Sequence, residues 1–109
     1  MTLLALGINH KTAPVALREK VAFTPDSLVE ALASLKKLEG VNESVIVSTC
    51  NRTELYVNAQ HDSATTLLSW LSEFHHLDVD EIEKNSYILS QDDAVKHIMR
   101  VASGLDSLI

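Results

Sequence analysis

The chain has 109 residues, 46% of them hydrophobic, and a formal net charge of −6 at pH 7. This length suffices for one small domain with its own core, and the composition is that of a folded protein. The negative charge argues against a domain that holds nucleic acid by its phosphates on its own. A single cysteine excludes an internal disulfide, and the sequence shows neither a signal segment nor a run as long as a membrane span, so a cytoplasmic protein is expected.

One strand and two helices are predicted before residue 41. Residues 3–8 form a continuous apolar run of strand length. Residues 15–22 are expected to form a short helix that carries Arg18 outward. Thr24 is a suitable cap for a longer helix, because proline follows it at the first helical position. The apolar face of this helix is predicted to carry Leu28, Leu32 and Leu35.

Two strands with a polar turn between them follow. Residues 44–49 and 53–59 are rich in β-branched and aromatic side chains, and this pattern predicts a hairpin. The turn carries Cys50, the only cysteine of the chain, beside Asn51 and Arg52.

The C-terminal half predicts a helix, a strand and a final helix. Asp62 or Ser63 is expected to cap a helix in which Trp70 belongs to the core. Residues 78–83 are expected to form a short helix or a turn. His75 and His76, at the end of the longer helix, are assigned to the surface. A strand is predicted over residues 86–89. The final helix is expected to start with Asp92 or Asp93 as its cap and to place four residues inward, namely Ala94, Ile98, Val101 and Leu105.

The order β-α-β-β-α-β, followed by one more helix, predicts an α+β fold of the ferredoxin-like, split β-α-β class. In this class an antiparallel sheet carries its main helices on one face. We find no repeat and no convincing internal linker, so residues 1–109 are treated as one domain. Because this fold hosts many functions, it does not identify an activity.

A cysteine at the mouth of a hairpin is a candidate nucleophile, since a thiolate attacks carbonyl carbons well and a nearby cation lowers the thiol pKa. The alternative is that Cys50 is a small apolar residue at the end of a buried strand, as many unpaired cysteines are. A metal site is disfavoured, because one cysteine and no His or Cys pair at zinc spacing are present.

Three segments resemble the catalytic domain of bacterial glutamyl-tRNA reductase. These segments are Gly-Ile-Asn-His-Lys-Thr-Ala-Pro-Val at residues 7–15, Ser-Thr-Cys-Asn-Arg-Thr-Glu at residues 48–54, and Met-Arg-Val-Ala-Ser-Gly-Leu-Asp-Ser at residues 99–107. The family reduces the glutamate of glutamyl-tRNA to glutamate-1-semialdehyde with NADPH, the first step of tetrapyrrole synthesis. The resemblance implies the same fold class and an enzymatic function.

The resemblance also implies roles for particular residues. Cys50 would form a thioester with the glutamyl group, and Arg52 would hold its side-chain carboxylate through two hydrogen bonds. Thr49, Asn51 and Ser107 would help to line the substrate site. His97 matches a histidine that is important for activity, and the choice between a base, an acid and an orienting group stays open. The alternative is a structural histidine at the margin of the apolar face of its helix. His10 lies in a matched segment, but no step is assigned to it.

In the family, NADPH binds to a separate domain, and a long C-terminal helix forms a homodimer. Neither part is present here, and no glycine-rich dinucleotide motif occurs in the chain. The expected partners of the full protein are therefore glutamyl-tRNA and a second subunit, with room for a regulatory protein and no membrane. The alternative function is a non-catalytic ferredoxin-like binding or regulatory module, in which the Cys50 turn is structural.

Overall fold

The computed structural model describes residues 2–49, 51–59 and 64–102 of the chain. Their helices and strands are β1 (Thr2–Asn9), α1 (Val15–Val21), α2 (Pro25–Lys36), β2 (Val41–Ser48), β3 (Arg52–Ala59), α3 (Ala64–His75), α4 (Val79–Lys84), β4 (Tyr87–Ser90) and α5 (Asp92–Ala102). None of the helices in these ranges is long and apolar enough to cross a membrane.

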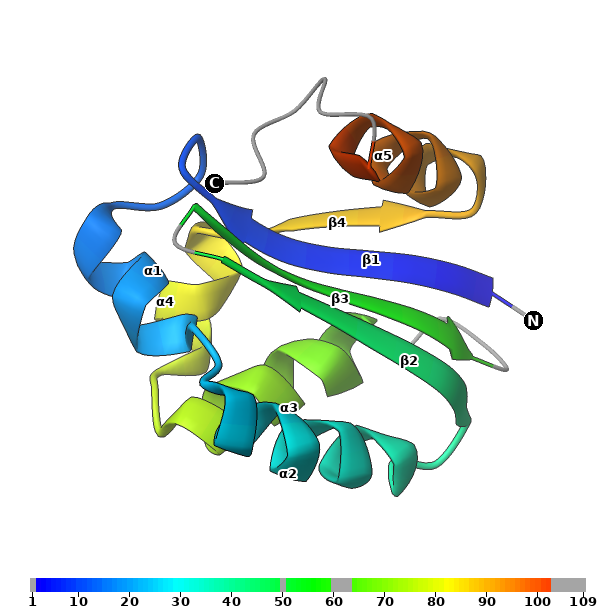
Figure 1. Cartoon of the computed structure of the whole chain (residues 1–109), viewed down its shortest axis with the longest axis horizontal. Helices are drawn as coiled ribbons and strands as arrows, with labels where there is room; N and C mark the ends of the chain where they lie inside the picture. The colour runs from blue at the N-terminus through cyan, green and yellow to red at the C-terminus, as the bar shows by residue number, and fades with distance from the viewer. Residues whose placement is uncertain (1, 50, 60–63, 103–109) are drawn as a thin grey trace.

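The strands form one sheet in the order β2-β3-β1-β4, and every neighbouring pair is antiparallel. Helices α1 to α4 lie on one face of the sheet, and α5 lies on the other face (Figure 1). The predicted α+β, ferredoxin-like sandwich with an additional C-terminal helix is confirmed. The additional helix is set apart from the others because it covers the opposite face.

Each strand sends alternate side chains to the two faces. On β1, Leu4, Leu6 and Ile8 enter the main core beneath α1 to α4, and their exposed fractions are at most 2%. Ala5 points to the α5 face, where a much smaller apolar cluster forms with Tyr56 and Ala94. The sheet therefore has one face that supplies most of the hydrophobic core and another that is only partly covered.

Three sequence predictions about the first half need correction. Strand β2 begins at Val41 rather than at residue 44, and an irregularity in its pairing with β3 follows at Glu43. On α2, Leu32 is 40% exposed, because the residue that faces the core in this turn is Ala31. Arg18 is half-buried rather than outward, for a reason given with the candidate site.

The last helix also differs from its prediction. Asp92 is the first residue of α5, so Asp92 and Asp93 lie in the first turn, after Gln91 at a φ of 52°. Ala94 and Val101 are buried as predicted, but Ile98 remains 37% exposed since α5 covers only part of its sheet face. Leu105, as well as the predicted caps Asp62 and Ser63, lie outside the described residues.

Trp70 belongs to the core, as predicted, and its indole N–H donates to Ser34 Oγ at 2.8 Å. It stacks on Phe74, and both rings lie beside Phe23. The surface assignment of His75 is wrong, because its ring lies 4.6 Å from that of Phe23 (centroid to centroid) and its Nε2 is buried. Burial lowers the pKa of His75 below its ordinary value of 6.5, despite a hydrogen bond with the backbone of Val21.

This burial predicts a stability that depends on pH. The unfolded chain binds a proton at His75 below pH 6.5, whereas the folded protein resists protonation, so the free energy of unfolding falls as the pH drops through that value. The nearby charge of His76 acts in the same direction. The variant His75→Phe keeps an aromatic ring but removes this titration.

We therefore expect urea unfolding at stepped pH to show a steeper acid loss of stability for the wild type than for His75→Phe. The exposed neighbour offers a control, since His76→Gln should retain most of the wild-type dependence. Parallel curves for wild type and His75→Phe would contradict the assignment.

Candidate active site

The turn between β2 and β3 is closed by hydrogen bonds around Thr49. Its backbone N–H donates to the carbonyl oxygen of Arg52 at 2.8 Å. Its hydroxyl oxygen accepts from the backbone N–H groups of Asn51 and Arg52, each at 3.3 Å. Thr49 therefore fixes the backbone on both sides of Cys50, which itself lies outside the described residues, as does Ser107.

A second guanidinium group lies beside this turn. Nη1 of Arg18, from α1, donates to Oδ1 of Asn51 at 3.4 Å. This contact explains why Arg18 is half-buried, and it joins α1 to the turn across 33 residues of sequence. Helical spacing alone places Arg18 on the outer side of α1, so the sequence gives no sign of this contact.

The predicted site residues Arg52 and His97 meet at a carboxylate that the sequence analysis left without a role. Oε2 of Glu54 lies 3.1 Å from Nη1 of Arg52 and 2.5 Å from Nε2 of His97. Tyr87 donates its hydroxyl hydrogen to the same oxygen, and the Tyr56 hydroxyl lies 2.7 Å from Oε1. We call Arg52, Glu54, Tyr56, Tyr87 and His97 the Glu54 cluster.

Strand register brings most of the cluster together. Arg52, Glu54 and Tyr56 are alternate residues of β3, so their side chains leave the same face of the sheet, the one that α5 covers. Gly7 of β1 pairs with Glu54 on one side and with Tyr87 of β4 on the other. His97 completes the cluster from α5.

Gly7 is what allows Tyr87 to reach Glu54. A Cβ atom at residue 7 would overlap Cζ of Tyr87 and lie 2.5 Å from its hydroxyl oxygen. The phenol ring therefore occupies the space above Gly7, between its own strand and β3. This is the close approach for which the position requires a residue without a side chain.

The cluster is closed to water on the sheet side. Side chains of Arg52 and Glu54 are 0% and 1% exposed, and that of His97 is 13% exposed. Burial raises the pKa of the Glu54 carboxyl, but hydrogen bonds from Tyr87, Tyr56 and His97, and the charge of His97, outweigh burial and hold this pKa below 4.5. Burial, together with the Glu54 carboxylate, raises the pKa of Tyr87 far above its ordinary range.

An ionised carboxylate against one ring nitrogen of a histidine is an arrangement suited to proton transfer, because it orients the imidazole and stabilises its protonated form. Within the described ranges no group of three or more His, Cys, Asp or Glu side chains is placed to hold a metal ion. The cluster is therefore best described as a candidate acid–base site beside the turn.

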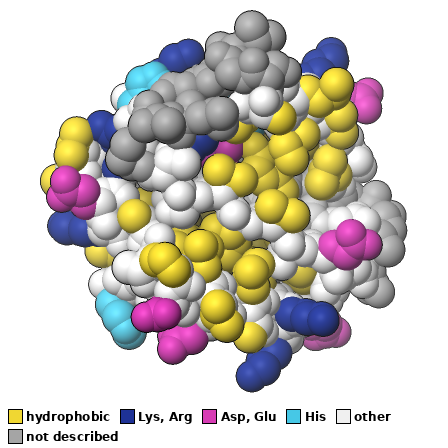
Figure 2. Space-filling model, viewed as in Figure 1, with side chains coloured by type: hydrophobic (Ala, Val, Ile, Leu, Met, Phe, Trp, Pro, Cys, Tyr) yellow, Lys and Arg dark blue, Asp and Glu magenta, His cyan; other side chains and the backbone are white. Residues whose placement is uncertain are grey.

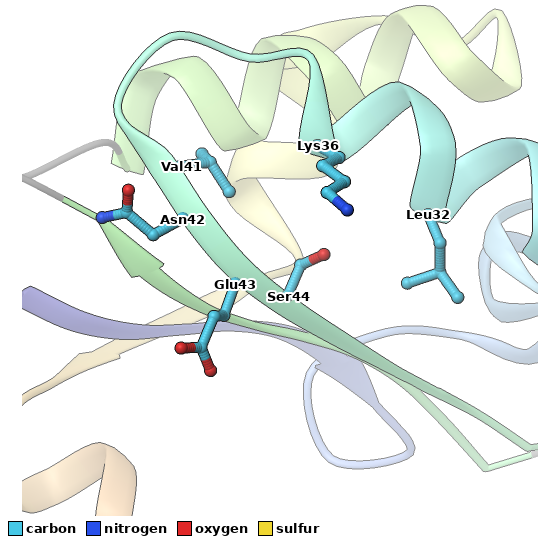
Figure 3. Close-up of a pocket in the computed structure, with 6 residues that line it drawn as sticks. All are labelled: Leu32, Lys36, Val41, Asn42, Glu43 and Ser44. Carbon is cyan, nitrogen blue, oxygen red and sulfur yellow. The ribbon is translucent and has the colours of Figure 1, made fainter.

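Two hollows lie on the described surface near the sheet. A groove of about 420 Å³ runs between α2 and the start of β2, and its lining includes Leu32, Lys36 and Ser44 (Figure 3). A smaller apolar hollow of about 170 Å³ lies on the α5 face, between Val45 and Ile98. Hydrophobic side chains gather on the visible surface around it (Figure 2). Tyr56 of the Glu54 cluster lines the smaller hollow, whereas Thr49, Asn51, Arg52 and His97 line neither.

One signal for the missed residues was present in the sequence. Arg52, Glu54 and Tyr56 stand at a spacing of two in a predicted strand, which places three polar groups on one face. Tyr87 gave no such signal, because only the pairing of β4 with β1 brings it to Gly7. His10, which was left without a role, is exposed, and the structure gives it none.

The family described as "Glutamyl-tRNAGlu reductase, N-terminal domain" matches residues 6–109. Similar curated proteins include the glutamyl-tRNA reductases of Pseudoalteromonas atlantica, 67% identical over 109 residues, and of Pseudomonas fluorescens strain SBW25, 57% identical over 109 residues. These alignments cover 100% of the chain but 26% and 25% of the two relatives, so the chain spans about a quarter of their length.

A solved structure is also similar. The glutamyl-tRNA reductase from Methanopyrus kandleri superposes with a TM-score of 0.73 at 34% sequence identity. This alignment covers 96% of the chain and 23% of the solved one.

The role of Gly7 can be tested by Gly7→Ala. The added methyl group must displace the Tyr87 ring and break its hydrogen bond with Glu54, so we expect a loss of about 1–3 kcal/mol in the free energy of unfolding. In the background of Tyr87→Ala the same change should cost much less, because the ring is gone. Chemical unfolding of the four proteins gives the coupling energy, and equal costs in both backgrounds would disprove the steric explanation.

Proposed function

Because the chain belongs to the family of glutamyl-tRNA reductase N-terminal domains, we propose that it binds the glutamyl group of glutamyl-tRNA and transfers it to Cys50. The observation that supports this most directly is the convergence of Arg52 and His97 on Glu54, beside the turn that Thr49 closes. Residues matched to the substrate and to proton transfer are thereby gathered at one end of the hairpin.

The proposed first reaction is acyl transfer. The sulfur of Cys50 attacks the ester carbon, a sulfur–carbon bond forms, and the bond to the ribose oxygen of the tRNA breaks. The thiol proton passes by way of His97 to the leaving oxygen, so the tRNA departs with a free hydroxyl group. Cysteine suits this step because part of its thiol ionises near neutral pH, and the resulting thioester is easier to reduce than an oxygen ester.

The other residues of the turn would bind the substrate. Thr49 and Asn51 would line the site, with Asn51 held by Arg18, and Ser107 is assigned to substrate contact by the family's pattern. Arg52 would contact the side-chain carboxylate of the glutamyl group. Its burial and its ion pair with Glu54 mean that the guanidinium would be shared between the protein and the substrate.

For the full-length protein we propose reduction of the thioester to glutamate-1-semialdehyde, an early step of tetrapyrrole synthesis, with NADPH as the reductant. The residues present do not fit the cofactor: the described sheet is antiparallel throughout, and the three glycines of the chain lie far apart in sequence. Phosphates of a dinucleotide need a glycine-rich turn that opens a helix after a parallel strand. NADPH binding is therefore assigned to the part of the relatives that this chain does not span.

The same division applies to the partners. With a net charge of −6, the chain is a poor surface for the body of a tRNA, so most phosphate contacts are assigned to other parts of the full protein. From the similarity to the family we also propose a homodimer through a C-terminal region of the full protein and a cytoplasmic location. A regulatory partner is left to experiment.

The proposal predicts a different outcome for each half of the reaction in the isolated chain. Incubated with labelled glutamyl-tRNA, it should form a hydroxylamine-labile adduct at Cys50 and release glutamate slowly, because water attacks the thioester. Even with NADPH it should form no semialdehyde. Mass analysis of the protein and assay of the small products measure both halves.

Cys50→Ser is the matched control, since Cys50 is the only cysteine. A thioester-like adduct in that variant would contradict the role of Cys50. Semialdehyde made by the isolated chain would contradict the assignment of NADPH binding to another part of the full protein. Iodoacetamide should label native Cys50, and a glutamate analogue should protect it. A thiol that reacts only after unfolding would favour the non-catalytic binding module.

Arg52→Lys tests recognition of the carboxylate in the full-length protein. A lysine keeps the charge but loses the two-pronged geometry, so we expect kcat/KM for glutamyl-tRNA to fall by about 2–5 kcal/mol in transition-state free energy. The loss should be much smaller with glutaminyl-tRNA, which lacks the carboxylate. If kcat/KM falls equally with both substrates, Arg52 acts only through Glu54. Near-normal kcat/KM values for Arg52→Lys would contradict the assignment.

A further inference from the structure

The two ring nitrogens of His97 lie in different surroundings. Nε2 faces the Glu54 cluster, 2.5 Å from Oε2 of Glu54 and 3.5 Å from the Tyr87 hydroxyl oxygen. For Nδ1, the described residues offer no hydrogen-bond partner. A neutral imidazole carries one proton, and the partner of one nitrogen decides which of the two holds it.

Glu54 is an acceptor at both of its oxygens. Oε2 receives hydrogen bonds from the Arg52 guanidinium and the Tyr87 hydroxyl, while Oε1 receives one from the Tyr56 hydroxyl. A buried carboxylate with a guanidinium and two hydroxyl donors is held in its ionised form. It has no hydrogen to offer, so the short contact to His97 requires Nε2 to be the donor.

We propose that Glu54, fixed by Tyr56 and Tyr87, holds neutral His97 in the tautomer with hydrogen on Nε2, so that Nδ1 is the nitrogen that takes and returns the proton during acyl transfer. This inference rests on the proposed function for its chemical step. It assigns Glu54, Tyr56 and Tyr87 as positioning residues, because they act on the reaction only through His97.

The two tyrosines hold different parts of the carboxylate. Tyr56 binds Oε1 from the same strand, and Tyr87 binds Oε2 from across Gly7, so the plane of the carboxylate is fixed from two sides. Tyr87 also packs edge-on against the imidazole, with ring centroids 5.4 Å apart and a 64° angle between the planes. The orientation of His97 therefore depends on its short contact with Glu54, a longer one with the Tyr87 hydroxyl group, and this ring contact.

In the proposed step, the lone pair of Nδ1 accepts the thiol proton while sulfur bonds to the ester carbon. The imidazole is then positively charged, and the ionised Glu54 stabilises it through Nε2. As the carbon–oxygen bond breaks, Nδ1 returns the proton to the ribose oxygen. His97 ends neutral in its starting tautomer, so no other proton donor or acceptor is needed.

The tautomer can be observed without any activity. In the nitrogen-15-labelled chain, at a pH where imidazole is neutral, long-range proton–nitrogen spectra should show Nε2 of His97 as the protonated nitrogen and Nδ1 as the bare one. Glu54→Gln should weaken this preference, since an amide can either donate or accept. Val95→Ala, at an exposed position of α5, should leave it unchanged.

Tyr87→Phe is the second variant, in case Glu54→Gln does not fold. It keeps the aromatic ring and removes only one hydrogen-bond donor to Glu54. In the full-length protein we expect it to lower kcat about tenfold, with little change in KM, as befits the loss of one hydrogen bond to a charged group. Glu54→Gln should lose more, within the range of about 10²–10⁴-fold that proton transfer contributes.

The outcomes separate the two proposals. Hydrogen on Nδ1 in the wild type, or a tautomer indifferent to Glu54→Gln, overturns the positioning inference even if Cys50 forms its thioester. Full activity of Cys50→Ser overturns the proposed function, whatever the tautomer is. A lower kcat with an unchanged KM in Tyr87→Phe, together with a shifted tautomer population, supports the inference.

Discussion

A buried, ionised carboxylate is the constraint on which the arrangement of the α5 face depends. Placing Glu54 in the interior without partners would cost several kcal/mol, so its neighbours must supply donors to both oxygens. They come from β3, β4 and α5, and they include a side chain that reaches across Gly7. Removal of any one donor leaves a charge that the remaining residues satisfy only in part.

This constraint also explains how the last helix is held. Few apolar side chains of α5 are buried, notably Ala94 and Val101, and Met99 is 64% exposed. Such a small contact area stabilises a helix only weakly. The hydrogen bond of His97 to Glu54 and its ring contact with Tyr87 therefore contribute specifically to where α5 lies, and they tie its position to the Glu54 cluster.

The two faces of the sheet carry different kinds of side chain. Its α1–α4 face carries the large core, built from residues such as Leu6 and Leu55, whereas its α5 face carries the Glu54 cluster. Because successive residues of a strand alternate between faces, one strand, β3, serves both purposes. A rigid scaffold under the cluster is what an acid–base site requires, since small displacements of the reacting groups cost much of the rate.

The sequence by itself determined the order of elements, the hairpin and the family. These follow from local patterns: apolar runs, a proline after Thr24, and the motif around Cys50, all of which act over a few residues. It also supplied Arg52 and His97 as candidates, through resemblance. Only the tertiary structure decided that they meet at Glu54, that Tyr87 joins them over Gly7, and that Arg18 turns inward to Asn51. The contacts of Tyr87 and His97 with Glu54, and of Arg18 with Asn51, join residues 33 to 43 positions apart through strand pairing and helix packing, which no local pattern encodes.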